Sequence, residues 1–108
     1  MKRKITSVEN YFETLDDRFN PEGAKGVDMT FQWEIDGNHW HAVIKDQKMT
    51  LHEGENADAT CTMHITGDNF VKMINGDLNE KLAILTRKIK VSGNKLQAGK
   101  VRRIFPIE

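Results

Sequence analysis

The sequence predicts an α+β protein in which a five-stranded, mostly antiparallel sheet is covered on one face by helices. Four consecutive segments alternate apolar and polar residues with the period of a β-strand, and each puts its apolar residues on one side. Segments at the start, in the middle and at the end of the chain repeat apolar residues at helical spacing instead. A sheet with one wet face and one apolar face needs a single covering layer, so we expect a two-layer sandwich.

The alternating segments define the strands and the side of each strand that faces the helices. They span residues 27–36, 38–46, 48–52 and 58–66, and a fifth spans 87–92. Asp36-Gly37-Asn38 has the chemistry of a hairpin turn, and Asp46-Gln47-Lys48 is a less ideal second turn, so the strands should follow one another as a meander. Strand parity puts four histidines on the solvent face and four other side chains in the core. The histidines are His39, His41, His52 and His64, and the core side chains are Trp33, Trp40, Cys61 and Met63.

The helices are marked by capping residues ahead of apolar residues at helical spacing. Ser7 precedes a helix that extends to Phe19. Thr66 and Asn79 precede two short helices in the middle of the chain. Asn94 opens a last helix, which Pro106 ends.

Length and composition indicate one domain, residues 1–108, that folds without disulfide bonds or a structural metal ion and needs no cofactor. No apolar run approaches the ~20 residues of a membrane span. The basic start Met1–Lys4 is followed by polar residues rather than a signal-peptide core, so we expect a cytoplasmic protein. Cys61 is the only cysteine and falls on the apolar face, which favours a small buried side chain over a reactive thiol.

Charge is distributed unevenly, although the net charge is zero. The stretch 81–107 is basic and contains no Asp or Glu. Such a block favours a solvated face, with transient contact to an anionic membrane or an acidic partner as alternatives. Nucleic acid is excluded, because the stretch lacks exposed aromatic residues for base stacking.

Residues that could carry chemistry are few. His39 and His41 are two apart on one strand and could chelate a metal, but histidines on a wet sheet face need no ligand. The sequence has no nucleophile elbow, phosphate loop or dinucleotide fingerprint. We therefore predict no catalytic residue and no metal site, and the oligomeric state stays open.

Four stretches together resemble a known family. They are Phe19-Asn20-Pro21-Glu22-Gly23-Ala24-Lys25-Gly26, Trp40-His41-Ala42-Val43-Ile44-Lys45-Asp46, Gly76-Asp77-Leu78-Asn79 and Lys88-Ile89-Lys90-Val91-Ser92-Gly93-Asn94. In order and spacing they are similar to the sterol carrier protein / nonspecific lipid-transfer family, in its small stand-alone bacterial form. The resemblance implies a five-stranded sheet covered by helices around an apolar tunnel. It also implies binding of fatty acids, fatty acyl-CoA, sterols or phospholipid without chemistry.

The chain departs from this family pattern at four positions. Gln47 and Arg87 stand where the family usually has glycine. Glu80 stands where proline is frequent, and Ile84 where phenylalanine is frequent. A Gln in a left-handed turn costs on the order of 1 kcal/mol, which the fold can tolerate. Arg87 could narrow the tunnel mouth or pair with an anionic ligand.

The resemblance therefore predicts a non-catalytic lipid-binding and transfer domain with an elongated apolar cavity between helices and sheet. The carboxylate or phosphate head is expected at Arg87, with Lys88 as the next choice. The expected wall consists of Phe31, Trp33, Trp40, Ile44, Met63, Phe70, Met73, Ile74, Leu82, Leu85 and Ile89, closed by Leu96, Val101 and Phe105. The alternative is an accessory or protein-interaction domain of the same fold with a filled core, which composition alone favours.

Overall fold

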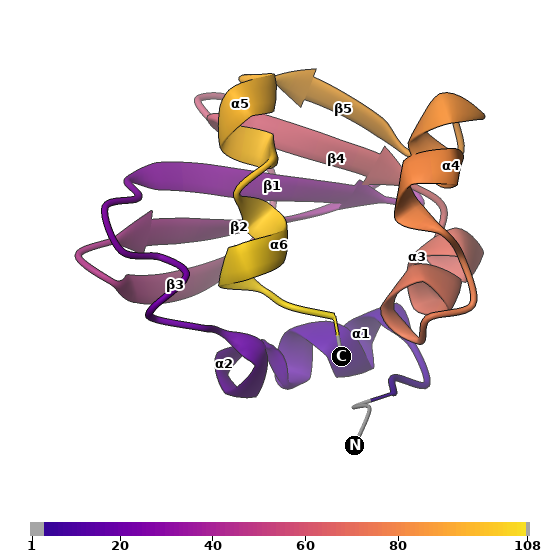
Figure 1. Cartoon of the computed structure of the whole chain (residues 1–108), viewed down its shortest axis with the longest axis horizontal. Coiled ribbons are helices and arrows are strands. Elements are labelled where there is room, and N and C mark those ends of the chain that lie inside the picture. Colours follow the sequence, from indigo (N-terminus) through magenta and orange to yellow (C-terminus); the bar gives the residue numbers. More distant parts are fainter. Residues whose placement is uncertain (1–3, 108) are drawn as a thin grey trace.

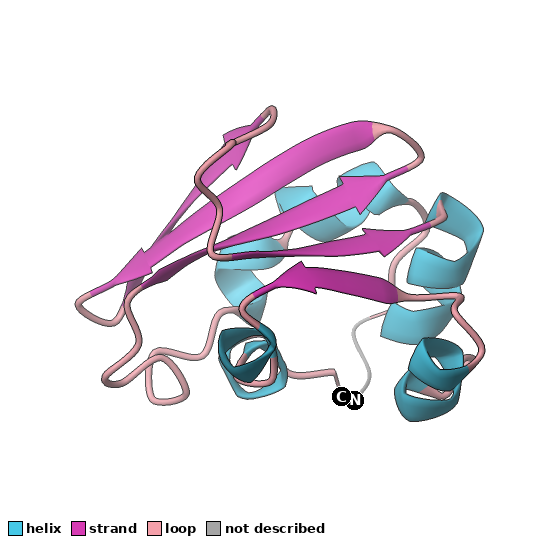
Figure 2. Ribbon diagram, turned by 90° about the horizontal axis from the view of Figure 1, so that it is seen from above, coloured by secondary structure: helices cyan, strands magenta, loops and turns pink. Residues whose placement is uncertain are grey.

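The computed structural model describes residues 4–107, so Met1 to Arg3 of the basic start and Glu108 lie outside the described residues. It contains a five-stranded sheet in the order β3-β2-β1-β4-β5. The strands are β1 (Met29–Ile35), β2 (Asn38–Lys45), β3 (Lys48–Glu53), β4 (Cys61–Ile65) and β5 (Lys90–Gly93). The described helices lie on one face of this sheet (Figures 1 and 2). The predicted α+β class is confirmed.

Only the first three strands form the expected meander. After β3 the chain crosses to the other side of β1, and β4 pairs with β1 in parallel while the remaining pairs are antiparallel. The two tight turns have the left-handed backbone that the sequence predicts. Asp36 and Gly37 have φ of 53° and 82°, and Asp46 and Gln47 have φ of 53° and 60°.

Side-chain caps begin most of the helices. The helices are α1 (Val8–Glu13), α2 (Leu15–Arg18), α3 (Gly67–Ile74), α4 (Glu80–Leu85), α5 (Lys95–Ala98) and α6 (Val101–Ile104). Ser7, Thr66, Asn79 and Asn94 each accept a hydrogen bond from the backbone N–H three residues later, as predicted.

Two predicted helices are each divided into two. The first is interrupted at Thr14, whose hydroxyl donates back to the Asn10 carbonyl at 2.9 Å. The last is interrupted between Ala98 and Val101, where Gly99 ends α5.

The last strand begins three residues later than the alternation predicts, because Arg87 ends α4. Arg87 has φ of 64°, its N–H donates to the Ile84 carbonyl, and the Lys88 N–H donates to the Ala83 carbonyl. These bonds define a Schellman motif with Arg87 at the position that glycine normally takes. The fourth strand also starts late, because Ala59 N–H closes a turn onto the Asn56 carbonyl.

Aromatic rings fill the centre of the space between sheet and helices. Trp33 packs against Phe12, Phe31 and Phe105, with ring centroids 5.1, 4.8 and 5.7 Å apart. Tyr11 contacts Phe70 at 4.9 Å, and burial raises the pKa of the Tyr11 phenol to about 12. This part of the core holds side chains rather than a tunnel.

The predicted faces of the sheet are largely correct. None of the four histidines is buried, and Trp33, Cys61 and Met63 are buried. The prediction that Trp40 is buried is wrong, because this side chain is only partly buried. It lies opposite Trp33 and stacks on Phe12 at 4.4 Å, at the margin of the helical layer, so one side stays open.

Among the described residues, no helix is long and apolar enough to cross a membrane.

Candidate functional site

A mostly apolar pocket lies between the sheet and the last helices. It has a volume of about 290 Å³ and opens to solvent. The sheet supplies its floor, α4 forms one side, and α5 and α6 form another (Figure 1). It is lined by Phe31, Met63, Glu80, Ile84, Ile89, Val91, Lys95, Ala98, Gly99, Val101 and Arg102. Ligand pockets typically begin at roughly 300 Å³, so this pocket suits a narrow apolar group.

Backbone geometry places α4 and α5 beside this floor. The Ala83 carbonyl accepts hydrogen bonds from the N–H groups of Lys88 and Ile89, which bring the start of the last strand back against α4. At the other end of that strand Gly93 has φ of 86°, and a Cβ there would lie 2.6 Å from the Thr60 carbonyl oxygen. Only glycine therefore allows the tight exit from β5 into α5.

Polar groups at the pocket come from α4, α5 and α6. Arg102 forms an ion pair with Glu80, and its Nη1 donates to the Phe105 carbonyl at 2.8 Å. Arg102 Nε is buried and makes no hydrogen bond within residues 4–107. Because Arg102 is paired with Glu80, Lys95 supplies the net positive charge at this apolar pocket, and Arg102 adds a donor without a partner in the described chain.

Four of the predicted wall residues line this pocket, and they come from the sheet side and α6. They are Phe31, Met63, Ile89 and Val101. Five others belong to the filled core, namely Trp33, Ile44, Phe70, Met73 and Phe105. The expected elongated cavity over all fourteen residues is therefore replaced by a shorter pocket toward β5.

Three predicted wall residues lie on the surface, outside this pocket. Leu82, Leu85 and Leu96 have 58%, 79% and 86% of their surface exposed and line no part of this pocket. For Leu82 and Leu85 the helical spacing suggested an inward face, but α4 buries only Ala83. Leu96 lies on α5, which buries no residue. A six-residue helix held by one small side chain leaves its leucines outside.

The predicted head-group residues are also placed elsewhere. Arg87 and Lys88 are exposed and do not line the pocket. Arg87 is instead the residue that ends α4, so its backbone role accounts for the family glycine at this position. Sequence reasoning missed Arg102, Lys95 and Glu80. The departures at Glu80 and Ile84 were a usable signal, since both residues line the pocket.

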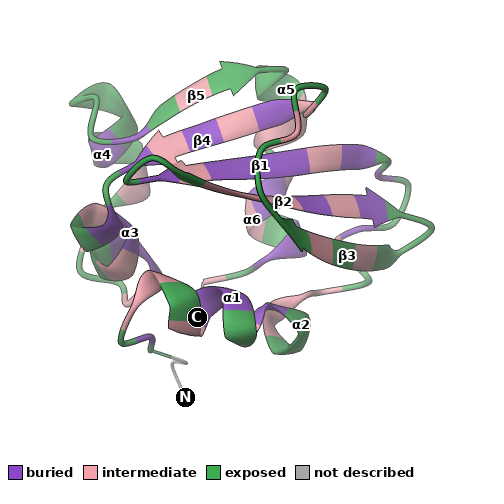
Figure 3. Cartoon of the chain, turned by 180° about the vertical axis from the view of Figure 1, so that it is seen from behind, coloured by how far each residue is buried: buried purple, intermediate pink, exposed green. Residues whose placement is uncertain are grey.

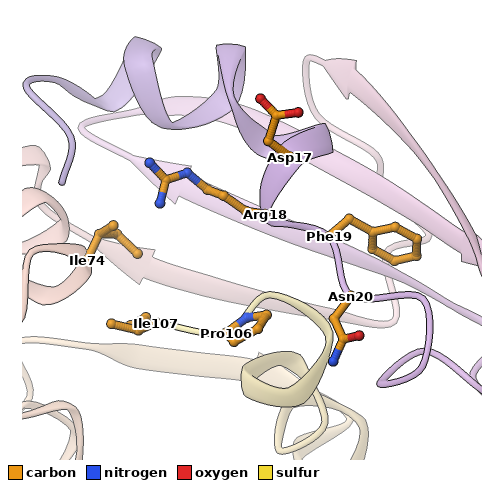
Figure 4. A pocket seen from close by; sticks show the side chains of 7 residues that line it. All are labelled: Asp17, Arg18, Phe19, Asn20, Ile74, Pro106 and Ile107. Carbon is orange, nitrogen blue, oxygen red and sulfur yellow. The ribbon is translucent and has the colours of Figure 1, made fainter. Parts of the chain in front are cut away.

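Two further hollows contain the remaining predicted residues. Ile74 lies with Arg18, Pro106 and Ile107 at a pocket of about 200 Å³ near the end of the described chain (Figure 4). Trp40 lies with Phe12 and Leu51 at a shallow hollow that also contains Glu9, Glu13 and Glu53. Three carboxyl side chains make the shallow hollow a poorer host for an anionic lipid. The pocket at Ile74 is smaller than the pocket toward β5, and it is lined by one acidic residue, Asp17, and one basic residue, Arg18.

The outer face of the sheet carries a polar chain of three side chains. His64 Nδ1 lies 3.2 Å from Glu34 Oε1, and His64 Nε2 lies 3.0 Å from Ser92 Oγ. The His64 side chain is 37% exposed, which sets this chain in solvent rather than in a water-limited site. Within residues 4–107 no three His, Cys, Asp or Glu residues are grouped as a metal site. Burial raises the pKa of the Cys61 thiol to about 11, which suits an inert core residue.

The architecture is a mixed sheet covered on one face by short helices, with a small apolar pocket between them. Comparison of the sequence with known protein families identifies the class of protein to which it belongs. The SCP-2 sterol transfer family matches residues 10–106, so the chain belongs to that family. Hydroxysteroid dehydrogenase-like protein 2 of Bos taurus is 29% identical over 108 residues, covering 96% of this chain and 26% of that protein. The chain therefore spans about a quarter of that relative.

Solved structures share the fold. Palmitated SCP2L2 from Aedes aegypti is 25% identical with a TM-score of 0.74, over 94% of this chain and 96% of that one. The sec-alkylsulfatase Pisa1 from Pseudomonas sp. is 21% identical with a TM-score of 0.76, over 88% of this chain and 16% of that one. The same fold thus occurs alone and as a minor part of a larger chain.

Proposed function

We propose that this protein binds a single-chain lipid, such as a fatty acid, in the pocket between β5, α4 and α5. The observation that carries the proposal is the pocket itself: its walls are mainly apolar, and its charged residues are concentrated in the helical side. Burial of an acyl chain contributes about 0.8 kcal/mol per CH₂, so apolar walls alone can provide affinity. The palmitated relative of the same fold supports this ligand class.

In this proposal Arg102 and Lys95 receive the anionic head. Arg102 already uses one nitrogen for Glu80 and another for the Phe105 carbonyl, and its Nε has no partner within the described chain. Because this Nε is buried, a lipid carboxylate can accept its charge-assisted hydrogen bond only after the Arg102 side chain turns toward the pocket.

The pocket volume limits the depth of binding. About 290 Å³ accommodates part of an acyl chain in the conformation described here. A longer chain requires α4 or α5 to move outward. Little packing opposes this movement in α4, because Ala83 is its only buried residue. We infer that the protein holds lipid without catalysis and exchanges it by displacement of these helices.

A direct test is to delipidate and refold the protein and to titrate it with palmitate under native mass spectrometry. We expect a saturable 1:1 complex. Lipids extracted from the purified protein should include single-chain acids. Failure to detect any saturable complex with palmitate, palmitoyl-CoA or a lysophospholipid would reject the proposal.

The second candidate is an accessory domain that acts through its surface. The filled aromatic core around Trp33 favours it, as does the small fraction of the dehydrogenase-like relatives that this chain spans. This role requires no ligand in the pocket. The same palmitate titration separates the two candidates, since an accessory domain gives no saturable complex.

A further inference from the structure

The helix α4 directs its two leucines away from the protein. Ala83 is buried, whereas Leu82, Ile84 and Leu85 are 58%, 47% and 79% exposed. At 100° per residue Leu85 points nearly opposite to Ala83, and Leu82 and Ile84 flank it. An ordinary surface helix has the reverse arrangement, with its apolar stripe toward the core.

A second exposed leucine surface lies on α5. Leu96 is 86% exposed and follows Lys95, which lines the pocket. The two helices adjoin opposite ends of β5 at the edge of the molecule (Figure 1), and much of both ribbons is coloured as exposed in Figure 3. We call Leu82, Leu85 and Leu96 the outer leucines.

Exposed basic residues lie next to the outer leucines in the sequence. Lys81, Arg87, Lys88 and Lys95 are exposed, and no acidic residue occurs between 81 and 107. The nearest acid, Glu80, is neutralised by Arg102. Exposed leucines among lysines and arginines are typical of segments that lie in the interface of an anionic bilayer.

We propose that α4 and α5 dock on an anionic bilayer, with the outer leucines inserted among the acyl chains and the basic residues at the head groups. The charge of this surface is the reason to prefer a bilayer over a second copy of the chain, because two such basic surfaces repel each other. The inference rests on the proposed function in one respect: docking would place the pocket next to its lipid source.

The test is co-sedimentation with phosphatidylcholine vesicles and with mixed phosphatidylcholine/phosphatidylserine vesicles at low salt. We expect binding to the mixed vesicles and much weaker binding to phosphatidylcholine alone. The variant Leu85→Ser/Leu96→Ser should lose roughly tenfold or more in partitioning. The variant Lys81→Gln/Lys88→Gln should lose roughly tenfold at low salt and less at high salt.

Lys45→Gln/Lys48→Gln is the matched control, since it removes the same charge from the exposed β2–β3 turn. It should bind the mixed vesicles as the unaltered protein does. Equal losses in both lysine variants, or equal sedimentation of the protein with both kinds of vesicle, would overturn the proposal. A dimer in light scattering that Leu85→Ser/Leu96→Ser abolishes would also overturn it, by assigning the leucines to a second copy.

Palmitate binding in the absence of vesicles separates this inference from the proposed function. The leucine variant should retain the affinity for palmitate, because neither leucine lines the pocket. Near-ultraviolet circular dichroism of each variant checks that the fold is intact. If the unaltered protein binds palmitate but not the mixed vesicles, the docking proposal is rejected and the lipid-binding proposal stands. If it binds the mixed vesicles but not palmitate, the lipid-binding proposal is rejected and the docking proposal stands.

Discussion

Glu80 and Arg102 are paired across the pocket, so that the first turn of α4 is tied to α6. This ion pair positions the guanidinium whose Nε is left without a hydrogen bond in the described chain. The pair therefore balances two of the charges that line the pocket and also holds the start of α4 against α6. It provides the first test of the proposed head-group site.

Arg102→Gln should weaken palmitate binding about tenfold, the effect expected from losing one hydrogen bond to a charged group. Arg87→Gln is the matched control and should have little effect, because Arg87 does not line the pocket. Isothermal titration with palmitate and with its uncharged methyl ester measures both. An equal loss for the ester would show that Arg102 supports packing rather than the carboxylate.

Ala98→Phe should fill the pocket without altering its charge. We expect at least about tenfold weaker palmitate binding, equivalent to losing burial of about two methylene groups. Leu96→Phe enlarges an exposed residue on the same helix and should leave palmitate binding unchanged. If Ala98→Phe binds palmitate normally, the acyl chain occupies another part of the molecule.

The ends of α3 and α4 offer a paired test of stability. Gly76 and Arg87 hold the same position in equivalent capping motifs, with φ of 83° and 64°. Arg87→Gly should stabilise the protein by about 0.5–1 kcal/mol, because a side chain is unfavourable in this conformation. Gly76→Arg should destabilise it by about 1–2 kcal/mol. Urea denaturation measures both, and a destabilising Arg87→Gly would show that the Arg87 side chain makes a contact of greater value.

Glu34 should make stability depend on pH in the acid range. Its carboxylate accepts a hydrogen bond from the Gly37 N–H, and this bond, followed by the one to His64, holds the pKa of Glu34 below its ordinary value. Because the folded pKa is the lower one, the stabilisation is present above the unfolded pKa and is lost as pH falls through the folded pKa. Glu34→Gln should flatten the decline in the free energy of unfolding between about pH 5 and pH 3. A decline identical to that of the unaltered protein would assign acid sensitivity to other groups.

Strand faces were predictable from the sequence because they depend on a local period. The alternation around Trp33 and Cys61 fixes which side chains are inward, and a shift of one residue would have reversed every face. The capping residues Ser7, Thr66, Asn79 and Asn94 were predictable for the same reason, since each acts on a backbone group three residues away.

The pocket was less predictable, because it depends on how tightly separate elements approach. Leu82 and Leu85 have the spacing of a buried stripe, yet the small Ala83 is the residue that fits against the chain entering β5. Arg102 and Glu80 are far apart in sequence, and their pairing across the pocket follows from tertiary packing. The parallel placement of β4 beside β1 likewise has no local signal.

The most direct test of the lipid-binding account is a palmitate titration followed by methyl NMR of the delipidated protein. The account predicts saturable shifts concentrated at Met63, Ile84, Ile89 and Val101, which line the pocket, with Ile44 in the filled core little changed. Saturable shifts centred on Ile74 and Ile107 instead, or no saturable shift at any methyl group, would contradict it.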